Sequence, residues 1–177
     1  MGRIGVPKPV KLIMSVIASD GQLFPEVSEV LAASYGGVDF ESDILPFDCT
    51  QYYTPEMGEG LLRRFYTFRP LIPRELLVRI KRETNEIEEE FGRQGKRRVN
   101  IDPGYICAEH LILATTKGYT HRPYLGEGIY ADLTLIYRTG ELRPLEWTYP
   151  DYASVQVREM LQGIRKRYLQ EFKEEGA

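Results

Sequence analysis

The order of apolar and amphipathic segments predicts an α+β protein with a ferredoxin-like βαββαβ core and a mainly antiparallel sheet. Short apolar runs typical of strands alternate with two stretches of helical periodicity in the N-terminal half. A strictly alternating segment follows, and a last helical pattern ends the chain. We therefore expect the core to be extended by a C-terminal β-hairpin and a C-terminal helix.

Four strands and two helices make up the expected βαββαβ unit. The first helix has apolar residues at helical spacing and is followed by Gly36 and Gly37, which favour a helix end. The second begins at Pro73, which suits a first turn, and repeats apolar side chains through Phe91. The strands are predicted at residues 11–18, 42–47, 61–71 and 99–101, the helices at 25–35 and 73–91, and a further strand at 111–116.

The expected hairpin begins with the clearest strand pattern in the chain, at residues 129–137. Strict alternation places Leu133 and Leu135 on one face of the sheet. The partner strand is predicted at residues 142–147. Because a one-residue slip would move its apolar residues to the other face, the pairing predicts a three-residue loop at 139–141.

The C-terminal helix is expected to follow a Thr148 cap, with Pro150 and Asp151 in its first turn. No repeat, low-complexity segment or linker divides the sequence, and 177 residues suit one core. Residues 1–177 are therefore expected to form a single domain. The apolar stripe of the last helix is Val157, Leu161, Ile164, Tyr168 and Phe172.

Composition and charge exclude several classes of function. The net charge of -3 disfavours a general nucleic-acid binder, and the basic segment 93–98 is interpreted as a solvated loop after a helix. No apolar run reaches the roughly 20 residues that span a bilayer, and the N-terminus lacks a hydrophobic signal core. We expect a cytoplasmic protein without a membrane partner. Abundant Arg and Glu with two Asn residues are typical of a heat-adapted source.

Cysteine and histidine usage limits the cofactors. Cys49 and Cys107 are far apart and have no paired spacing, so neither a disulfide framework nor a zinc cluster is expected. The two histidines, His110 and His121, are too few for a histidine-rich metal site. We expect no haem, flavin or zinc, and any metal would be a hard ion such as magnesium with oxygen ligands.

Polar residues concentrate between Asn100 and Arg122. Asn100 and Asp102 precede Pro103 and Gly104, a pattern that by itself favours a turn. The residues downstream point to a ligand, because a lysine and an arginine together hold anions well and a histidine transfers protons near neutral pH. The candidates are Asn100, Thr115, Lys117 and Arg122 for ligand binding, and Asp102 and His121 for catalysis.

Two further polar clusters could belong to the same site. Tyr52, Tyr53 and Glu56 lie in a loop between strands, where the tyrosines could stack on a planar ligand or simply cover the core. On the second helix, Lys81 and Asn85 form a polar row with Glu88, and an exposed stabilising row explains this spacing equally well.

Asp132 on the strand at 129–137 and Glu146 on its partner are candidate magnesium ligands or an acid and base pair. The expected register places Thr134 opposite Glu146 and Asp132 opposite Thr148. Solvated cross-strand residues are the competing interpretation. Sequence motifs for nucleotide binding, the Gly-x-x-x-x-Gly-Lys-Ser/Thr and Gly-x-Gly-x-x-Gly runs, do not occur.

Over nearly its whole length the chain resembles a prokaryotic family known as domain of unknown function 4416. This resemblance implies a family grouping and contributes no reaction. The two His-x-Thr/Ser motifs of the two-histidine phosphoesterases are missing, since His110 precedes Leu-Ile and His121 precedes Arg-Pro. The matching segments are residues 7–12, 47–58, Lys81 with 84–85, 100–105, 114–117, 121–125 and 147–152.

The sequence thus predicts a protein that binds a small anionic ligand, a phosphate ester or a nucleotide, and leaves open whether it acts on that ligand as an enzyme. The alternative is a non-catalytic interaction module or a homo-oligomer surface, formed by the tyrosines and an exposed sheet edge. RNA binding is the weakest hypothesis because the net charge is negative.

Overall fold

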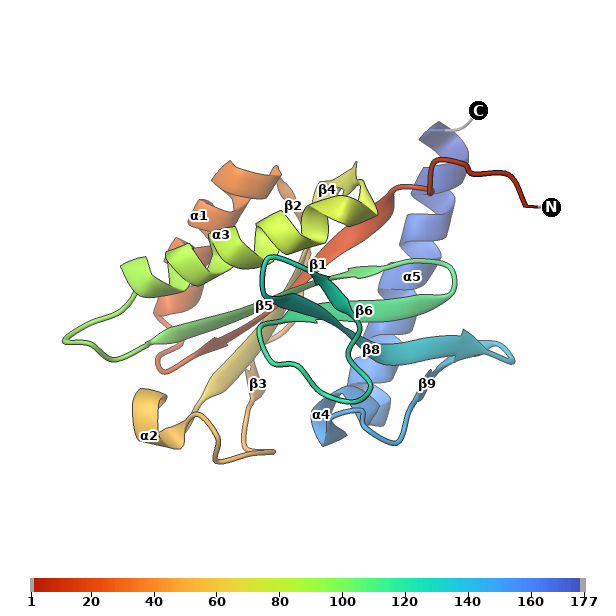
Figure 1. Ribbon diagram of the computed structural model, residues 1–177. Helices are drawn as coiled ribbons and strands as arrows, with labels where there is room; N and C mark the ends of the chain where they lie inside the picture. The colour runs from red at the N-terminus through yellow and green to blue at the C-terminus, as the bar shows by residue number, and fades with distance from the viewer. Residues whose placement is uncertain (1, 176–177) are drawn as a thin grey trace.

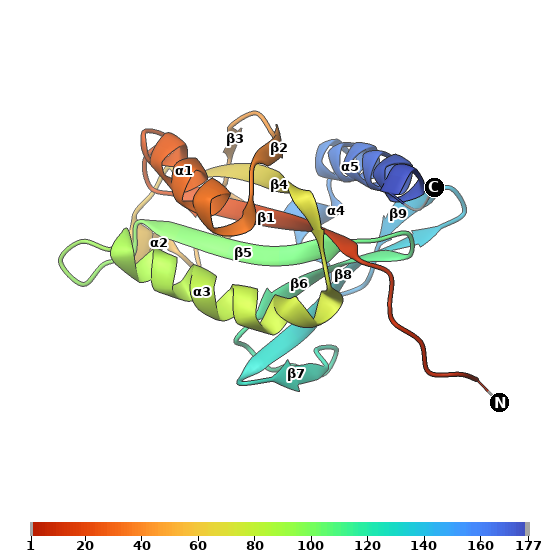
Figure 2. The same cartoon turned by 90° about the horizontal axis from the view of Figure 1, so that it is seen from above.

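The computed structural model describes residues 2–175, which form a nine-stranded sheet with helices on both faces (Figures 1 and 2). The strand order is β2-β4-β1-β5-β6-β8-β7, with β3 paired to β4 and β9 paired to β8. The elements are β1 (Val10–Ala18), α1 (Leu23–Tyr35), β2 (Val38–Glu41), β3 (Leu45–Pro46), α2 (Thr54–Met57), β4 (Leu62–Ile72), η1 (Arg74–Leu76), α3 (Leu77–Glu90), β5 (Val99–Ile106), β6 (His110–Thr115), β7 (Tyr124–Gly126), β8 (Ile129–Arg138), β9 (Glu141–Pro144), α4 (Pro150–Ala153) and α5 (Val155–Glu175).

The α+β class and the mainly antiparallel sheet are confirmed. The strands expected for the βαββαβ unit lie in the order β2-β4-β1-β5, and each neighbouring pair is antiparallel. All nine residues of β1 are buried, because both of its edges are paired and helices cover both of its faces. The finer ferredoxin-like assignment stays a prediction.

Alternation along β1 separates two hydrophobic clusters. Leu12 and Met14 belong to a cluster with α1 and α3, which lie above the strands in Figure 1. Ile13 points the other way, into a cluster that includes Leu161 and Ile164 of α5. The predicted stripe of the last helix is therefore confirmed as core, and its Tyr168 reaches the first cluster.

Two predictions about the strands of the expected βαββαβ unit are wrong. The strand expected at residues 42–47 is replaced by β2 at Val38–Glu41 and the two-residue β3 at Leu45–Pro46. The segment from Asn100 to Gly104 does not turn but continues as β5, which runs to Ile106. Proline is tolerated within this strand because the pairing of β5 with β6 begins only at Gly104, so Pro103 has no hydrogen bond to donate at that edge.

The strict alternation expected in β8 is interrupted by a bulge. Ile112 pairs with Leu133 whereas Leu111 pairs with Leu135, so Thr134 is an extra residue on β8. As a result, Ile129 packs in the α1–α3 cluster and Leu135 in the α5 cluster. The apolar side chains of the two halves of β8 therefore point to opposite faces of the sheet, which strict alternation does not predict.

The C-terminal hairpin also differs from its predicted register. Arg138 pairs with Glu141, which leaves a two-residue turn of Thr139 and Gly140. Both have positive φ, 50° and 91°, as a tight primed turn requires, so the three-residue loop is wrong. The strand β9 ends at Pro144, before Trp147.

The start of the last helical region is correct in part. Pro150 and Asp151 lie in the first turn of α4, as predicted. Thr148 is not a cap, because its hydroxyl donates to the backbone oxygen of Thr134 at 2.6 Å. No helix among residues 2–175 is long and apolar enough to cross a membrane.

Candidate functional site

A gap in the sheet between β5 and β6 forms the base of the candidate site. The two strands pair only from Gly104 to Ile106 and then separate. Pro103 ends the ladder because proline has no N–H to donate. At Gly104 the strands are so close that a Cβ atom would lie 2.3 Å from the carbonyl oxygen of Ile112. Pro103 thus marks the point where β5 and β6 separate, and Gly104 allows the two strands to lie close together next to it.

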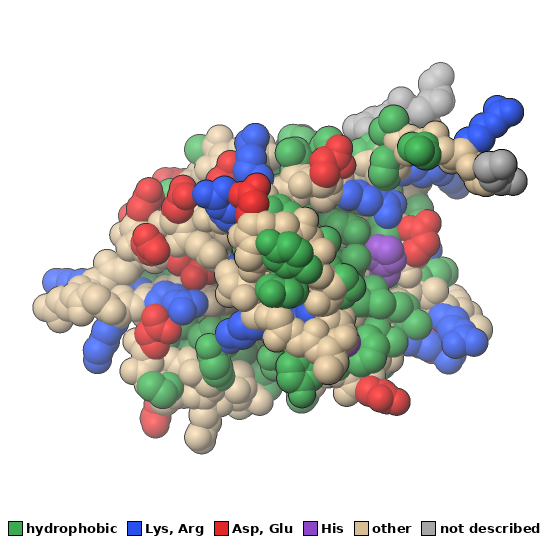
Figure 3. Space-filling view, in the orientation of Figure 1, with side chains coloured by type: hydrophobic (Ala, Val, Ile, Leu, Met, Phe, Trp, Pro, Cys, Tyr) green, Lys and Arg blue, Asp and Glu red, His purple; other side chains and the backbone are tan. Residues whose placement is uncertain are grey.

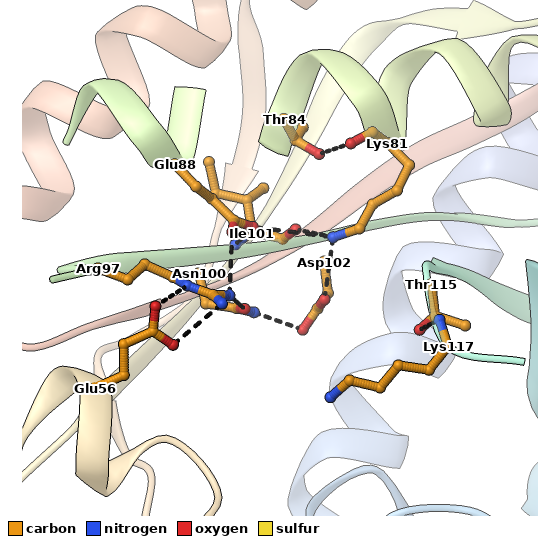
Figure 4. Close-up of polar contacts among 10 residues, drawn as sticks. All are labelled: Glu56, Lys81, Thr84, Glu88, Arg97, Asn100, Ile101, Asp102, Thr115 and Lys117. Carbon is orange, nitrogen blue, oxygen red and sulfur yellow. Dashed lines mark hydrogen bonds and ion pairs between the residues drawn. The ribbon is translucent and has the colours of Figure 1, made fainter. Parts of the chain in front are cut away.

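Side chains of α3 complete the hydrogen bonds that β5 loses at this gap (Figure 4). The Lys81 ammonium donates to the Ile101 carbonyl oxygen at 2.8 Å, and the Ile101 N–H donates to a Glu88 oxygen at 2.7 Å. Both side chains are buried, with 5% and 7% exposure. The predicted polar row is therefore confirmed as a row, but Lys81 and Glu88 are not exposed.

Lys81 and Glu88 also belong to a network of polar side chains that orients Asp102. Arg97 bonds to Glu88 at 3.2 Å and to the Asn100 side-chain oxygen at 2.8 Å. The Asn100 amide then donates to one Asp102 oxygen at 2.9 Å, and Lys81 lies 3.5 Å from the other. Asp102 is held from both sides while its side chain keeps 28% exposure.

Burial shifts the proton affinity of two groups near this network. It raises the pKa of Glu88 to about 7, although Lys81 and the Ile101 N–H favour the ionised form. Burial also raises the pKa of Tyr53, and the nearby Asp102 charge adds to the effect. Both groups therefore hold their protons more strongly than they would in water.

The facing wall comes from the loop after β6. The Thr115 hydroxyl accepts the Lys117 N–H at 3.2 Å, and Arg122 donates to the Lys117 carbonyl oxygen at 3.2 Å. Arg122 also pairs with Asp132 at 2.7 Å, which fixes the loop to β8. The Lys117 ammonium lies 3.7 Å from the centre of the Tyr52 ring.

These walls enclose a cavity of about 920 Å³. Every residue predicted to bind the ligand lines it, together with Asp102 and Asp132. The structure therefore brings these residues together around one cavity, and their role in binding stays a prediction. The ligand-binding set comprises Tyr52, Tyr53, Glu56, Lys81, Asn85, Asn100, Thr115, Lys117 and Arg122.

Two predicted site residues lie elsewhere. His121 does not line the cavity; its ring stacks on Trp147 at 4.8 Å, and its Nε2 atom lies 3.7 Å from Asp132. Glu146 is exposed and also outside the cavity lining, because β9 ends before it. Of the expected Asp132 and Glu146 pair, only Asp132 lines the cavity. The residues that the structure describes contain no group of three or more His, Cys, Asp or Glu placed to hold a metal.

The cavity floor contains residues that the sequence did not reveal. Arg63 of β4 pairs with Asp151 of α4, and its guanidinium lies 4.4 Å from the centre of the Phe47 ring. Tyr152 is buried beside them, and burial raises its pKa to about 12. Two signals in the sequence could have indicated these residues. Arg63 is a charged residue within an apolar strand, and Asp151 was explained by the helix dipole alone.

The cavity lining is balanced in charge, and its charged groups mostly neutralise one another. The basic residues are Arg63, Lys81, Lys96, Arg97, Lys117 and Arg122, and the acidic residues are Glu56, Glu88, Glu89, Asp102, Asp132 and Asp151. Among the side chains that the structure describes, residues 2–173, neither Lys117 nor Lys96 has a carboxylate within 4.0 Å. Lys117 is the one of these two that contacts an aromatic side chain of the cavity.

Comparison with known proteins places this arrangement in a family. The family model Domain of unknown function (DUF4416) matches residues 8–168. The chain belongs to the DUF4416 family. The matched range includes every lining residue of the cavity in this DUF4416 member. No curated protein and no solved structure matches the chain.

Proposed function

We propose that the cavity binds a small anionic ligand, a phosphate ester or a nucleotide, and that Lys117 contacts its charged group. The observation that carries this proposal is the meeting of polar residues from four distant segments around one 920 Å³ cavity. That volume lies within the range of small-molecule sites, which are usually concave and few in a protein.

Lys117 is the most suitable contact for an anion. The other basic groups deep in the cavity, Arg63, Lys81, Arg97 and Arg122, are each engaged by at least one carboxylate. An anion bound there would compete with an existing ion pair. Lys117 has no such pair among the described side chains, residues 2–173, and its ammonium has three donors. A phosphate oxygen can therefore bind it without loss elsewhere.

Asp102 is the residue through which a reaction in the cavity would act. It is oriented by Asn100 and Lys81 and remains partly exposed, so it can accept a proton or a hydrogen bond from a ligand. His121 lies outside the cavity lining, which weakens its candidacy as the proton-transferring group. The proposal therefore concerns binding first, with Asp102 as the group to substitute if turnover is found.

A thermal-shift screen with phosphate-bearing compounds, each with and without magnesium, tests the proposal. We expect at least one compound to raise the melting temperature of the wild type. The variant Lys117→Gln should bind it about tenfold or more weakly, as loss of one charge-assisted hydrogen bond implies. The control Lys166→Gln changes an exposed lysine of α5 outside the cavity and should bind like wild type. Equal affinity for both variants would refute the role of Lys117.

An interaction surface is the second candidate, supported by exposed aromatic side chains near β7. Tyr119, with 69% exposure, contacts His121, which in turn stacks on Trp147. Tyr124 and Leu125 on β7 are also exposed, and hydrophobic side chains appear on this side of the molecule in Figure 3. Sedimentation over a range of concentrations tests this candidate, since a monomer at every concentration would exclude a homo-oligomer.

A further inference from the structure

The contact between Lys117 and Tyr52 joins two loops that both line the cavity. The Tyr52 ring has 61% exposure, and Lys117 approaches it at 3.7 Å. Tyr53 meets the Tyr52 ring edge-on at 5.0 Å and also packs against buried Phe47 at 5.9 Å. The exposed ring is therefore held in position by a neighbour that is anchored in the core.

An exposed, anchored tyrosine that lines a cavity has the features of a stacking platform for a planar ligand. Planar heterocycles stack on such rings with little dependence on their identity, because every base has a π-face. Lys117 lies over one face of the Tyr52 ring and adds a binding group for a negative charge, so a base would stack on the face that Lys117 does not cover. The pair consequently presents one ring face suited to a flat ring and one cation suited to a phosphate.

Hydrogen-bonding groups on the β5 side of the cavity have unused capacity. Figure 4 shows the Lys117 ammonium and the Asp102 carboxylate directed toward the same space from opposite sides. Each Asp102 oxygen has one partner within the described residues, and a carboxylate can accept about four hydrogen bonds. Asp102 can therefore accept hydrogen bonds from the hydroxyls of a sugar.

We propose that the ligand is a nucleoside phosphate, with its base stacked on Tyr52, its phosphate on Lys117 and its sugar hydroxyls facing Asp102. This inference rests on the proposed anion-binding function and narrows it from any phosphate ester to one that carries a planar ring. Because the sequence contains neither of the two glycine-rich nucleotide motifs, the inference assigns phosphate recognition to side chains of the loop at 115–122.

Calorimetric titration with AMP, GMP, CMP and UMP, with ribose 5-phosphate as the matched ligand lacking a base, tests the inference. We expect at least one nucleotide to bind about tenfold or more tightly than ribose 5-phosphate. In Tyr52→Leu that advantage should disappear, whereas Tyr52→Phe, which keeps the ring, should retain it. The control Tyr124→Leu removes a tyrosine with the same 61% exposure outside the cavity and should behave like wild type.

The outcomes separate this inference from the proposed function. Equal binding of ribose 5-phosphate and all four nucleotides, unaffected by Tyr52→Leu but weakened by Lys117→Gln, would overturn the nucleoside assignment and leave anion binding intact. Failure of every phosphate compound to bind the wild type would overturn both. Loss of the base advantage in Tyr124→Leu as well as Tyr52→Leu would also count against a specific stacking platform.

Discussion

Lys81 and Glu88 are buried charges that replace a missing strand partner. They bond to the carbonyl oxygen and the N–H of Ile101, where β6 no longer does. Lys81→Met keeps the aliphatic stem but leaves the buried Ile101 carbonyl oxygen without its donor and removes one of the two cations near Glu88. We expect a loss of about 3–5 kcal/mol in the free energy of unfolding, measured by urea denaturation. Lys166→Met, at an exposed position, should stay within about 0.5 kcal/mol of wild type, and a similarly small effect at Lys81 would contradict this role.

The raised pKa of Glu88 makes a prediction about pH. Its ordinary pKa is 4.5 and burial raises it to about 7 in the folded state. Between these values the unfolded state has released the proton that the folded state still holds, so stability falls as pH rises through this window. In urea titrations, wild type should therefore lose roughly 1–3 kcal/mol relative to Glu88→Gln between pH 4.5 and pH 8.

Glu88→Gln retains an oxygen that can accept the Ile101 N–H, so the comparison isolates the charge. Glu89→Gln changes the exposed neighbour and should follow the wild-type pH profile. Parallel profiles for wild type and Glu88→Gln would show that Glu88 is ionised throughout the window.

At the residue scale, helical spacing identified the row of Lys81, Asn85 and Glu88 but could not show that it is buried. That burial depends on a gap two elements away, where β5 and β6 separate. The sequence indicated Asp102 because polar residues follow it in the chain, whereas in the structure Asn100 and Lys81 hold it at the cavity. Its Pro-Gly neighbours are typical of a turn, whereas here they end a ladder within a strand.

At the element scale, the close approach of β5 and β6 at Gly104 is the feature that makes the gap possible. Gly104→Ala would place a Cβ 2.3 Å from the Ile112 oxygen and 2.7 Å from the Leu113 side chain, so a backbone shift is required. We expect destabilisation of about 1–3 kcal/mol in chemical denaturation. The same substitution at Gly163 in α5 meets no atom within 4 Å and should stabilise by about 0.5–1 kcal/mol. Effects of the same sign at both positions would contradict this account.

The sequence predicted the elements with strong hydrophobic periodicity. It did not predict the features that depend on the register between neighbouring strands. The apolar run of β1 and the stripe of α5 are local signals that the final packing preserves. The β8 bulge at Thr134 and the turn at Thr139 and Gly140 arise from the register between strands. These two features moved Trp147 and Glu146 away from the positions that alternation predicted.

At the scale of the whole molecule, the site forms because segments distant in sequence meet at the sheet gap. The loop at 47–56, helix α3, strand β5 and the loop after β6 each contribute polar side chains to one cavity. The sequence predicted most of these residues because polar side chains clustered in its loops. It missed Arg63, Asp151 and Tyr152, whose positions depend on how α4 packs against β4.

Chemical labelling of Cys49 tests the central claim, that this cavity is the ligand site. Cys49 is exposed and lines the cavity, whereas Cys107 is fully buried, so a thiol reagent should modify one cysteine in the folded protein and two after denaturation. A phosphate ligand from the screen, at a concentration close to its wild-type Kd, should slow Cys49 modification, and the slowing should be largely lost in Lys117→Gln but kept in Lys166→Gln. Unchanged Cys49 reactivity in the presence of a ligand that calorimetry shows to be bound would place the binding site elsewhere and contradict the account.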